Sequence, residues 1–563
     1  MADLYRNGWP NIIGARRQTI GDHFDAQVDR HRDREAVVDR QKGVRLTYGQ
    51  LGEAATRLAQ GLLTLGVAAG ERVGIWSPNR WEWIVTQFGT PKIGTILVNV
   101  NPSYRLRELR YALRQSGIRT LITAPGFGKS DYLGMLRELL GDLGSGGLPH
   151  PDFPDLREIV VLDEQAPRGM LTWSDLMNLG EDTPASAVES RQAEVQFDEP
   201  VNIQYTSGTT GLPKGATLSH HNLLNNGYFI GELMRFTPKD RLCIPVPFYH
   251  TFGMVLANLA CVTHGAAMVI PGEGFDPGQV LATVEAEHCT ALHGVPTMFI
   301  AELGHPDFDH FDLSSLRTGL MAGSPCPVEV MRQVQSRMHM SEVEIAYGMT
   351  ETSPVSTQTR ADDPLELRVG TVGRVHPHVE VKIVDPATGH VVPQGTPGEL
   401  LTRSYAVMLG YWENPEATAQ AIDAARWMHT GDLAVMREDG YINIVGRMKD
   451  MIIRGGENIY PREIEEFYYI HPKVEDIQVI GVPDVKYGEQ VMAWIRLRPG
   501  ETSTEEEMRE FARGQIAHFK IPRYVKFVGA FPMTVTGKVQ KYMMREAAVK
   551  ELGLESAAGQ TTA

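Results

Sequence analysis

Residues 205–220 are Tyr205-Thr-Ser-Gly-Thr-Thr-Gly-Leu-Pro-Lys-Gly-Ala-Thr-Leu-Ser-His220. Six of these residues carry hydroxyl groups, namely Thr206, Ser207, Thr209, Thr210, Thr217 and Ser219. Three glycines, Gly208, Gly211 and Gly215, let the backbone turn where a side chain would clash, and Lys214 lies among them. Such a loop can surround an anion with N–H and O–H donors. It therefore predicts a site for a polyphosphate.

The spacing of this loop differs from the Walker P-loop, which needs G-x-x-x-x-G-K-[ST]. Here Lys214 follows Pro213 and precedes Gly215, so no hydroxyl residue comes after it to hold a magnesium ion. A loop rich in glycine and threonine can also be a plain surface linker. The assignment therefore depends on the rest of the chain.

Length and charge limit the classes of protein that the chain can belong to. At 563 residues it is too long for one compact domain, and its length predicts two to four. The net charge is -15, and no basic stripe is present, which argues against nucleic-acid binding. Because the bulk field repels anions, a polyphosphate site here has to be locally positive or rich in N–H donors.

Cysteine usage and hydropathy indicate a cytoplasmic protein. The four cysteines, Cys243, Cys261, Cys289 and Cys326, form no C-x-x-C pair, which favours a reducing compartment and disfavours a disulfide framework or a zinc site. The first residues lack an apolar core typical of a secretory signal. The most apolar stretch, 255–271, is too short and interrupted to span a bilayer. Peripheral membrane contact and homodimerisation are left open.

The first part of the chain has the rhythm of an α/β fold. Thr47 and Gln50 form a capping box, which predicts a helix start there. Strands are predicted at 73–76, 96–100 and 120–123, and helices at 81–88 and 106–113. Alternating strands and helices predict a parallel sheet covered on both faces.

The pattern changes from about residue 370. Apolar runs at 369–374, 379–384 and 398–402 predict short strands separated by glycine and proline turns. Beyond Gly446-Arg-Met-Lys-Asp450 we expect a small α+β unit, in which Pro461 opens a helix. Strands at 477–482 and 491–497 and a helix at 504–516 follow.

Six segments resemble, in order, the signature motifs of the adenylate-forming superfamily, which includes acyl-CoA synthetases, luciferases and the adenylation domains of peptide synthetases. They are 206–215, Ala322-Gly-Ser-Pro325, Tyr347-Gly-Met-Thr-Glu351, Thr430-Gly-Asp432, Gly446-Arg-Met-Lys-Asp-Met-Ile-Ile-Arg-Gly-Gly-Glu-Asn-Ile-Tyr-Pro461 and Pro532-Met-Thr-Val-Thr-Gly-Lys538. The resemblance covers essentially the whole chain.

This resemblance implies a fold and a domain plan. The fold class is α/β, with a large N-terminal domain of two αβαβα-type sheets and a small β-barrel subdomain, hinged to a small α+β C-terminal domain. We expect the first domain at 1–448, with its β-rich part at about 370–448, and the mobile C-terminal domain at 449–553. The tail at 554–563 is small and polar, and we expect it to be disordered.

The resemblance also implies which residues bind ATP. The phosphates would be bound by Thr206, Ser207, Gly208, Thr209, Thr210, Gly211 and Lys214. The adenine pocket would be formed by Gly323, Ser324, Pro325, Tyr347 and Gly348, with the Tyr347 ring stacked on the base. Asp432 would accept hydrogen bonds from the ribose hydroxyls, and Arg447 would be a second ribose or phosphate contact.

The catalytic roles implied by the resemblance fall on four residues. Glu351 would hold Mg²⁺, which prefers hard oxygen ligands, and Thr350 would bind the α-phosphate. Lys538 would neutralise charge that develops between the attacking carboxylate and the α-phosphate. His250, in Pro247-Phe-Tyr-His-Thr-Phe-Gly253, would lie beside the acyl carbonyl, although a histidine in an apolar loop is equally often only packed.

The same resemblance implies a change of domain orientation between two half-reactions. Lys449 would be the hinge. Gly455 and Gly456 would let the pantetheine arm of coenzyme A pass close to the backbone.

Within the superfamily, 455–461 and Met408-Leu-Gly-Tyr-Trp412 look most similar to bacterial and mitochondrial medium-chain fatty acyl-CoA synthetases. This implies an AMP-forming acid–thiol ligase that uses ATP, Mg²⁺ and coenzyme A. Its acyl pocket would draw on Tyr228, Phe252, Met298, Phe299 and Met349, residue types that are equally typical of a core.

Alternatives stay open at this point. The acid could be short and branched, a thioether or an aryl acid. The acceptor could be a carrier protein. A luciferase-like oxygenase and a nucleotide-binding sensor without turnover are more distant readings.

Overall fold

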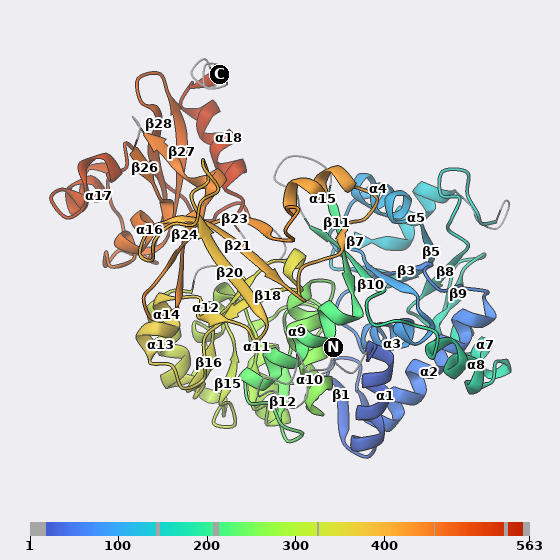
Figure 1. The fold of residues 1–563 in the computed structure, drawn as a ribbon. Helices are drawn as coiled ribbons and strands as arrows, with labels where there is room; N and C mark the ends of the chain where they lie inside the picture. Colours follow the sequence, from blue (N-terminus) through green and yellow to red (C-terminus); the bar gives the residue numbers. More distant parts are fainter. Residues whose placement is uncertain are drawn as a thin grey trace. The chain divides into compact units, whose positions relative to one another are not determined.

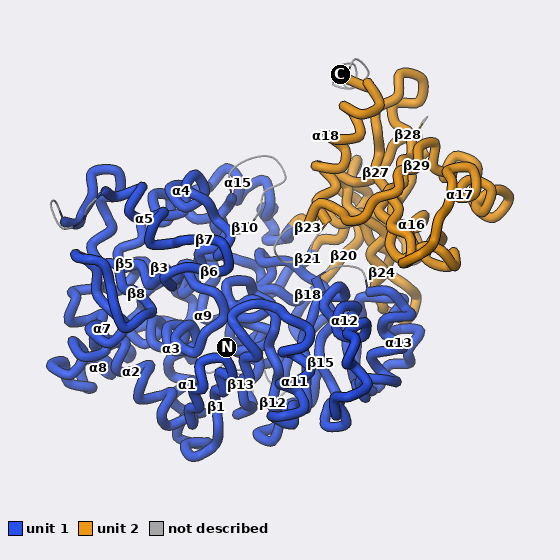
Figure 2. The backbone as a smooth tube through the Cα atoms, turned by 180° about the vertical axis from the view of Figure 1, so that it is seen from behind, with its two compact units in different colours: residues 1–380, 402–428 blue, residues 381–401, 429–563 orange. Residues whose placement is uncertain are grey.

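The computed structural model describes residues 18–141, 143, 147–206, 213–323, 326–454, 457–533 and 539–555. The chain divides into two compact units, shown in Figure 2. The first comprises Met1–Glu380 and Thr402–Met428, and the second Val381–Leu401 and His429–Ala563. This division by compactness does not test the predicted domain boundary at 448, which stays a prediction. Of the predicted tail, residues 556–563 lie outside the described residues.

The first unit contains an eight-stranded sheet (Figure 1). Its order is β22 (Gly410–Tyr411), β11 (Lys214–Ser219), β10 (Pro200–Thr206), β4 (Ile96–Asn99), β3 (Arg72–Trp76), β5 (Ile118–Thr123), β8 (Glu158–Val161) and β9 (Leu171–Thr172). From β10 to β9 all neighbours are parallel, whereas β10–β11 and β11–β22 are antiparallel. The strands predicted at 73–76, 96–100 and 120–123 are confirmed as β3, β4 and β5.

A second sheet of seven strands lies in the same unit. Its order is β16 (Glu342–Glu344), β15 (Thr318–Leu320), β14 (Ala291–Leu292), β12 (Arg241–Cys243), β13 (Ala267–Ile270), β1 (Glu35–Asp39) and β2 (Val44–Thr47). Only the β1–β2 pair is antiparallel. Strand β12 ends at Cys243, because Pro245 and Pro247 lack the N–H groups that would continue the pairing.

Consecutive residues of these strands face different cores, as the pleat requires. Val37 and Ile75 belong to one core, while their neighbours Val38 and Trp76 belong to two others. Both sheets are therefore buried on both faces, and the predicted pair of αβαβα-type sheets is confirmed.

Helices from separate parts of the chain build these three cores. The shared core between the sheets includes α1 (Ile20–His31), α2 (Tyr48–Thr64), α3 (Trp81–Gly89), α9 (His220–Leu233) and α10 (Ala260–His264). The outer core of the eight-stranded sheet takes α4 (Leu106–Ser116) and α5 (Tyr132–Leu140). That of the seven-stranded sheet takes α11 (Pro277–Glu287), α12 (Pro296–Leu303) and α13 (Val328–Arg337). The capping box of Thr47 and Gln50 is present at the start of α2.

A three-stranded antiparallel sheet corrects one prediction. It consists of β17 (Ala346–Gly348), β18 (Val355–Gln358) and β19 (Arg374–Val375). The segment 369–374 was predicted as one strand, but α14 (Leu365–Gly370) occupies its start, and only its last residue, Arg374, belongs to a strand, β19. Val369 packs into the outer core of the seven-stranded sheet from this helix. Tertiary burial therefore outweighed the local strand preference of the valines.

Two sheets account for most of the second unit. A four-stranded sheet has the order β20 (Val379–Val384), β21 (Gly398–Ser404), β23 (Met428–Met436) and β24 (Ile442–Arg447), and its first three strands start or end within the first unit. A five-stranded sheet comprises β25 (Ile452–Arg454), β26 (Glu457–Ile459), β27 (Val474–Asp484), β28 (Gly488–Leu497) and β29 (Tyr524–Phe527). Helices α16 (Pro461–Tyr469) and α17 (Glu505–Ala512) share one core with this sheet, and α18 (Lys541–Glu551) shares another. Pro461 opens α16 as predicted.

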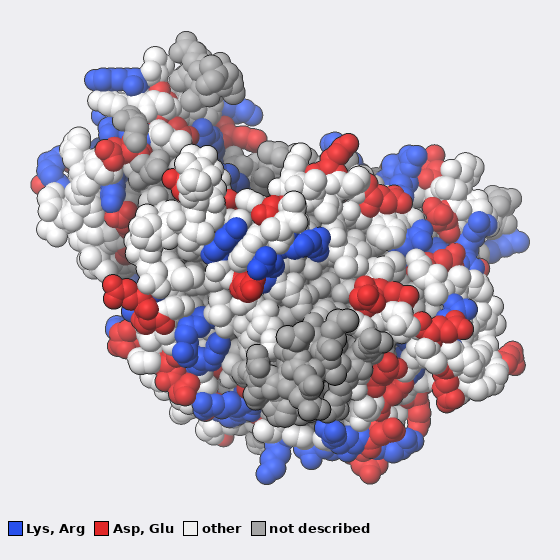
Figure 3. All heavy atoms as spheres, in the orientation of Figure 1, with Lys and Arg blue, Asp and Glu red and all other residues white. Residues whose placement is uncertain are grey.

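The surface carries charges of both signs (Figure 3), and the cysteines are unpaired. On the face shown in Figure 3, acidic and basic side chains are interspersed. All four cysteines are free and buried. Among the described residues, no helix has the length and apolar character needed to cross a membrane.

One buried imidazole makes the first unit sensitive to acid. The Nδ1 atom of His220, the first residue of α9, accepts a hydrogen bond of 3.1 Å from the Ile20 backbone N–H. Burial lowers the pKa of His220 to about 3, and nearby Asp22 offsets this only in part. In the unfolded chain the pKa of a histidine is about 6.5. Between these two pKa values, His220 is therefore protonated in the unfolded state and neutral in the folded state.

We expect the free energy of unfolding to fall as the pH drops below 6.5, and His220 to account for about 2 kcal/mol of the loss by pH 5. Urea unfolding, followed by tryptophan fluorescence at pH 7 and pH 5, would measure it. His220→Asn keeps an acceptor for the Ile20 N–H and cannot be protonated, so its midpoint should depend less on pH. Identical pH dependence in both proteins would contradict the assignment.

Candidate active site

Strands β10 and β11 hold the ends of the predicted phosphate loop. Thr206 pairs with Lys214 at the last rung of this antiparallel ladder, and the Thr206 hydroxyl lies 3.4 Å from the Lys214 carbonyl. Residues 207–212 lie outside the described residues, and with them the predicted ligands Ser207, Gly208, Thr209, Thr210 and Gly211. Only Thr206 and Lys214 of the predicted loop ligands are therefore placed.

Glu351 follows β17 in a short 3-10 helix, Thr350–Thr352. The turn before it is tight, since a Cβ atom on Gly348 would lie 1.7 Å from the Pro354 carbonyl oxygen. The Glu351 side chain is buried. A buried carboxylate without hydrogen-bond donors would destabilise the folded state, and Glu351 has two donors. Its Oε1 accepts from the Tyr411 hydroxyl at 2.8 Å and from the Thr206 hydroxyl at 3.4 Å.

The sequence did not reveal the role of Tyr411. The segment 408–412 lies along β11, where the Leu409 N–H donates to Thr217 and the Trp412 N–H donates to Gly215. Burial, and then the charge of Glu351, raise the pKa of Tyr411, so its hydroxyl is protonated and donates. The Lys214 ammonium lies 5.1 Å from the centroid of the Tyr411 ring, within cation–π distance.

This cluster of Thr206, Lys214, Glu351 and Tyr411 combines hard oxygen donors with a cation. Mg²⁺ prefers oxygen ligands and usually keeps several waters. Within the parts of the chain that the structure describes, no group of three or more His, Cys, Asp or Glu side chains could hold a metal ion. The Glu351 carboxylate and the neighbouring hydroxyl oxygens are ligand types that suit such an ion.

The other predicted nucleotide residues of the first unit are only partly described. Thr350 is buried, Tyr347 is half-buried and Gly348 is exposed. Gly323 has φ +91°, a backbone conformation that favours glycine. Ser324 and Pro325 lie outside the described residues.

His250 is held by its own turn. Its Nδ1 atom accepts from the Phe252 N–H at 3.2 Å, so the neutral ring carries its proton on Nε2. The π-helix η4 (Phe252–Leu259) follows at once. π-Helices are rare overall, but those that occur are frequently found at functional sites.

The predicted acyl residues separate into two groups. Phe252 belongs to the core between the two sheets, and Tyr228, Met298 and Met349 pack against it while partly exposed. Phe299 is fully buried in the outer core of the seven-stranded sheet instead.

In the second unit, Asp432 and Arg447 are cross-strand partners in β23 and β24. The Arg447 Nε atom lies 3.3 Å from Asp432 Oδ1, and Arg447 is more exposed than Asp432. Lys449 is exposed in a 3-10 turn. Gly455, Gly456 and Lys538 lie outside the described residues.

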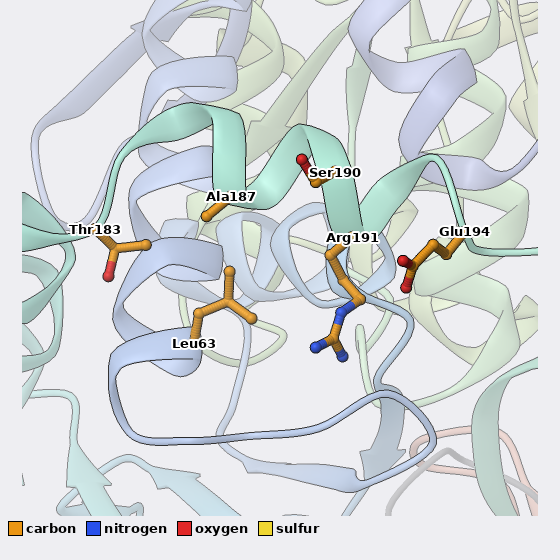
Figure 4. Close-up of a pocket in the computed structure, with 6 residues that line it drawn as sticks. All are labelled: Leu63, Thr183, Ala187, Ser190, Arg191 and Glu194. Carbon is orange, nitrogen blue, oxygen red and sulfur yellow. The ribbon is translucent and has the colours of Figure 1, made fainter.

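A surface hollow of about 440 Å³ lies elsewhere in the first unit (Figure 4). It is lined by Leu63 of α2 and by residues in or beside α8 (Ala185–Gln192), namely Thr183, Ala187, Ser190, Arg191 and Glu194. None of the predicted site residues is among them.

Two family models and several curated relatives match this chain. Residues 24–412 match the family model of the AMP-binding enzymes, and residues 463–538 match that of the AMP-binding enzyme C-terminal domain. YngI of Bacillus subtilis (strain 168), whose name assigns it provisionally to the acyl-CoA synthetases, is 50% identical over 541 residues, covering 96% of this chain and 98% of YngI. The mitochondrial medium-chain acyl-CoA ligase ACSF2 is 45% identical in Danio rerio (95% of this chain, 89% of the relative) and 41% identical in Homo sapiens (95% and 88%).

Solved structures show the same similarity. The anthranilate CoA ligase AuaEII in complex with anthranoyl-AMP has a TM-score of 0.85 at 28% identity, covering 95% of this chain and 98% of AuaEII. ATP-bound MatB from Rhodopseudomonas palustris has a TM-score of 0.82 at 29% identity, covering 94% of this chain and 99% of MatB.

Tyr411→Phe removes the closer of the two donors to Glu351. A hydrogen bond to a charged group contributes about 1.5–3 kcal/mol, so acid-dependent pyrophosphate release from ATP should fall roughly 10-fold to 100-fold. Tyr48→Phe is a matched control, since Tyr48 is buried in the same unit and donates to the Ala266 carbonyl. Pyrophosphate release should stay at the native rate in Tyr48→Phe. Unchanged release in Tyr411→Phe would contradict the role of Tyr411.

Proposed function

The chain belongs to the AMP-binding enzyme family, and we propose that it is an acyl-CoA synthetase, which joins a carboxylic acid to coenzyme A and converts ATP to AMP and pyrophosphate. The observation that carries the proposal is the contact of Glu351 with both Thr206 and Tyr411. It brings a buried carboxylate to the start of the hydroxyl-rich loop. Relatives named as acyl-CoA synthetase and acyl-CoA ligase, 41–50% identical along nearly the whole chain, support it.

In the first half-reaction, a carboxylate oxygen attacks the α-phosphorus of ATP. The bond from that phosphorus to the bridging oxygen breaks, and pyrophosphate leaves with the electron pair. Such a transfer depends mainly on positioning and charge stabilisation. The product is an acyl-adenylate, a mixed anhydride that is a better acyl donor than the carboxylate.

The residues of this chain would supply the positioning. Residues 206–211 and Lys214 would hold the phosphates, and Thr350 would bind the α-phosphate. Gly323, Ser324, Pro325, Tyr347 and Gly348 would form the adenine pocket. Asp432 and Arg447 would bind the ribose, and Lys538 would neutralise charge as the carboxylate attacks.

Mg²⁺, held by Glu351, would supply positive charge to the triphosphate oxygens when bound. The buried carboxylate and the neighbouring hydroxyls are the oxygen ligands that suit it.

In the second half-reaction, the coenzyme A thiolate attacks the acyl carbonyl carbon. The bond from that carbon to the AMP oxygen breaks, and AMP leaves. A rotation at Lys449 would bring Gly455 and Gly456 to the acyl-adenylate in place of Lys538, a hinge motion that exchanges two faces of one domain.

We propose a medium-chain fatty acid as the substrate. The medium-chain acyl-CoA ligases at 41–45% identity support it. So does the apolar character of Phe252, which belongs to the core between the sheets, and of Tyr228, Met298 and Met349, which pack against that core. An aryl acid is the second candidate, because the anthranilate CoA ligase has so similar a fold. We propose the cytoplasm as the location, from cysteine usage, although relatives named mitochondrial exist.

The experiment that tests this function measures pyrophosphate and AMP release from ATP over a panel of acids. The panel runs from short to long chains and includes branched and aryl acids, each with and without coenzyme A. Turnover with medium-chain fatty acids, and only with coenzyme A present, is the expected result. Stoichiometric pyrophosphate that coenzyme A does not increase would indicate a carrier-protein acceptor. No acid-dependent release would overturn the ligase assignment.

Lys538→Ala separates the two half-reactions. Removing one group that stabilises the transition state costs about 100-fold or more, so acyl-adenylate formation should fall by that factor. Conversion of supplied acyl-adenylate to the thioester should stay within a few-fold of the native rate. Lys526→Ala, which removes a lysine paired with Glu551 in the same unit, is the control and should change neither rate. If Lys538→Ala keeps both rates, the catalytic role of Lys538 is wrong.

A further inference from the structure

The segment 244–251, which joins β12 to η4 and carries His250, is anchored in an unusual way. Its prolines, Pro245 and Pro247, prevent regular strand pairing. Buried side-chain amides replace that pairing. Asn79 donates to the Val246 carbonyl at 2.9 Å and accepts from the Phe248 N–H at 2.8 Å.

Two further amides converge on a single carbonyl, that of Tyr249, the residue before His250. Asn99 Nδ2 and Gln204 Nε2 each lie 3.1 Å from the Tyr249 carbonyl oxygen. Both side chains are 2% exposed. A carbonyl oxygen has two lone pairs, so both acceptor positions of Tyr249 are filled by side chains that belong to a different sheet from β12.

These donors cannot easily turn away. Asn99 ends β4 and Gln204 lies within β10, and they are register partners in this parallel pair. Asn99 Oδ1 accepts from Asn202 Nδ2 at 3.0 Å, and Asn202 also donates to the Leu97 carbonyl at 2.8 Å. Because the Asn99 oxygen is used in this way, its NH₂ group faces Tyr249.

The same strand reaches the nucleotide cluster. Alternate residues of a strand share a face, so Asn202, Gln204 and Thr206 lie in one row along β10. Successive members of this row are about 7 Å apart. Gln204 thus holds the His250 segment, and Thr206, the next member of the row, contacts Glu351.

Stability alone does not account for this row. Gln204 Oε1 and Asn202 Oδ1 are buried and have no hydrogen-bond partner within the described part of the protein. Each such atom costs about 1–3 kcal/mol, so the amides are kept for the donors that they direct at the Tyr249 carbonyl and at the Leu97 and Asn99 oxygens. Polar groups kept at a cost in stability point to a functional constraint on geometry.

We propose that Gln204 and Asn99 are positioning residues that hold the Tyr249 carbonyl and thereby set His250 at a defined distance from the Thr206–Glu351 pair. The acid bound beside His250 then meets the α-phosphate in line. This inference rests on the proposed ligase function. The buried polar side chains of β10 and β4 would then align the acid with the nucleotide.

The test uses Gln204→Met, which keeps the side-chain length and removes the donor, Asn99→Leu, and the double variant. Misplacing a reacting group by about 1 Å can cost 100-fold in rate. We expect Gln204→Met to raise KM for the acid and lower kcat, reducing kcat/KM about 10-fold to 100-fold, with KM for ATP within about twofold of the native value. Because both donors share one carbonyl, the double variant should lose more than the product of the single losses.

Gln27→Met is the matched control. Gln27 is also buried, and its amide donates to a carbonyl, that of Thr263, at 3.4 Å. Its melting temperature should fall about as much as that of Gln204→Met, while its kinetic constants stay native. A catalytic loss in Gln27→Met equal to that in Gln204→Met would overturn the proposal.

A second measurement does not depend on activity. Backbone amide hydrogen exchange of residues 246–254 should speed up in Gln204→Met and further in the double variant, but not in Gln27→Met. If the native protein turns over no acid, the ligase function fails while this exchange result still tests the anchor. If the native protein is active, then native kinetics in Gln204→Met, or lost activity with unchanged exchange, overturns the positioning role.

Discussion

A buried carboxylate has to be hydrogen-bonded, and in this protein that requirement ties together three segments that are far apart in the sequence. Glu351 has its donors in Thr206, at the end of β10, and Tyr411, in β22. Tyr411 can reach it only because β22 adds to β11 as the edge strand of the eight-stranded sheet. The Met408 N–H also donates to the Glu351 carbonyl, so the backbone is held as well as the side chain. The position of β22 at the edge of the sheet therefore lets both the side chain and the backbone of Glu351 be hydrogen-bonded.

The sheets contribute polar groups in a second way. A strand buried on both faces is usually apolar throughout, but one face of β10 carries Asn202, Gln204 and Thr206 in succession. The opposite face carries Ile203 and Tyr205 and packs normally against the outer core. The strand thus stabilises the fold with one face and organises the site with the other. This division explains how a proline-rich segment can lie in the interior with its backbone groups satisfied.

Local signals in the sequence predicted much of the fold. The capping box at Thr47 and Gln50 and the proline at 461 define helix starts through contacts within one turn, and the structure has both. The strands predicted at 73–76, 96–100 and 120–123 were also correct, because apolar runs bounded by turn residues are local patterns. The segment 369–374 was predicted wrongly. The backbone conformation of Val369 depends on packing against a core formed by residues distant in the sequence, and not on its sequence neighbours.

The sequence by itself determined the family, the α/β class and the identity of the groups suited to nucleotide chemistry, since each motif is a short run whose spacing is visible in one dimension. Only the tertiary structure decided that Tyr411 donates to Glu351, and that Asn99 and Gln204 share the Tyr249 carbonyl. These partners are separated by 60, 150 and 45 positions in the chain. No local pattern encodes such a pairing, because it arises from the order of strands in a sheet, and that order is set by burial of both sheet faces at once.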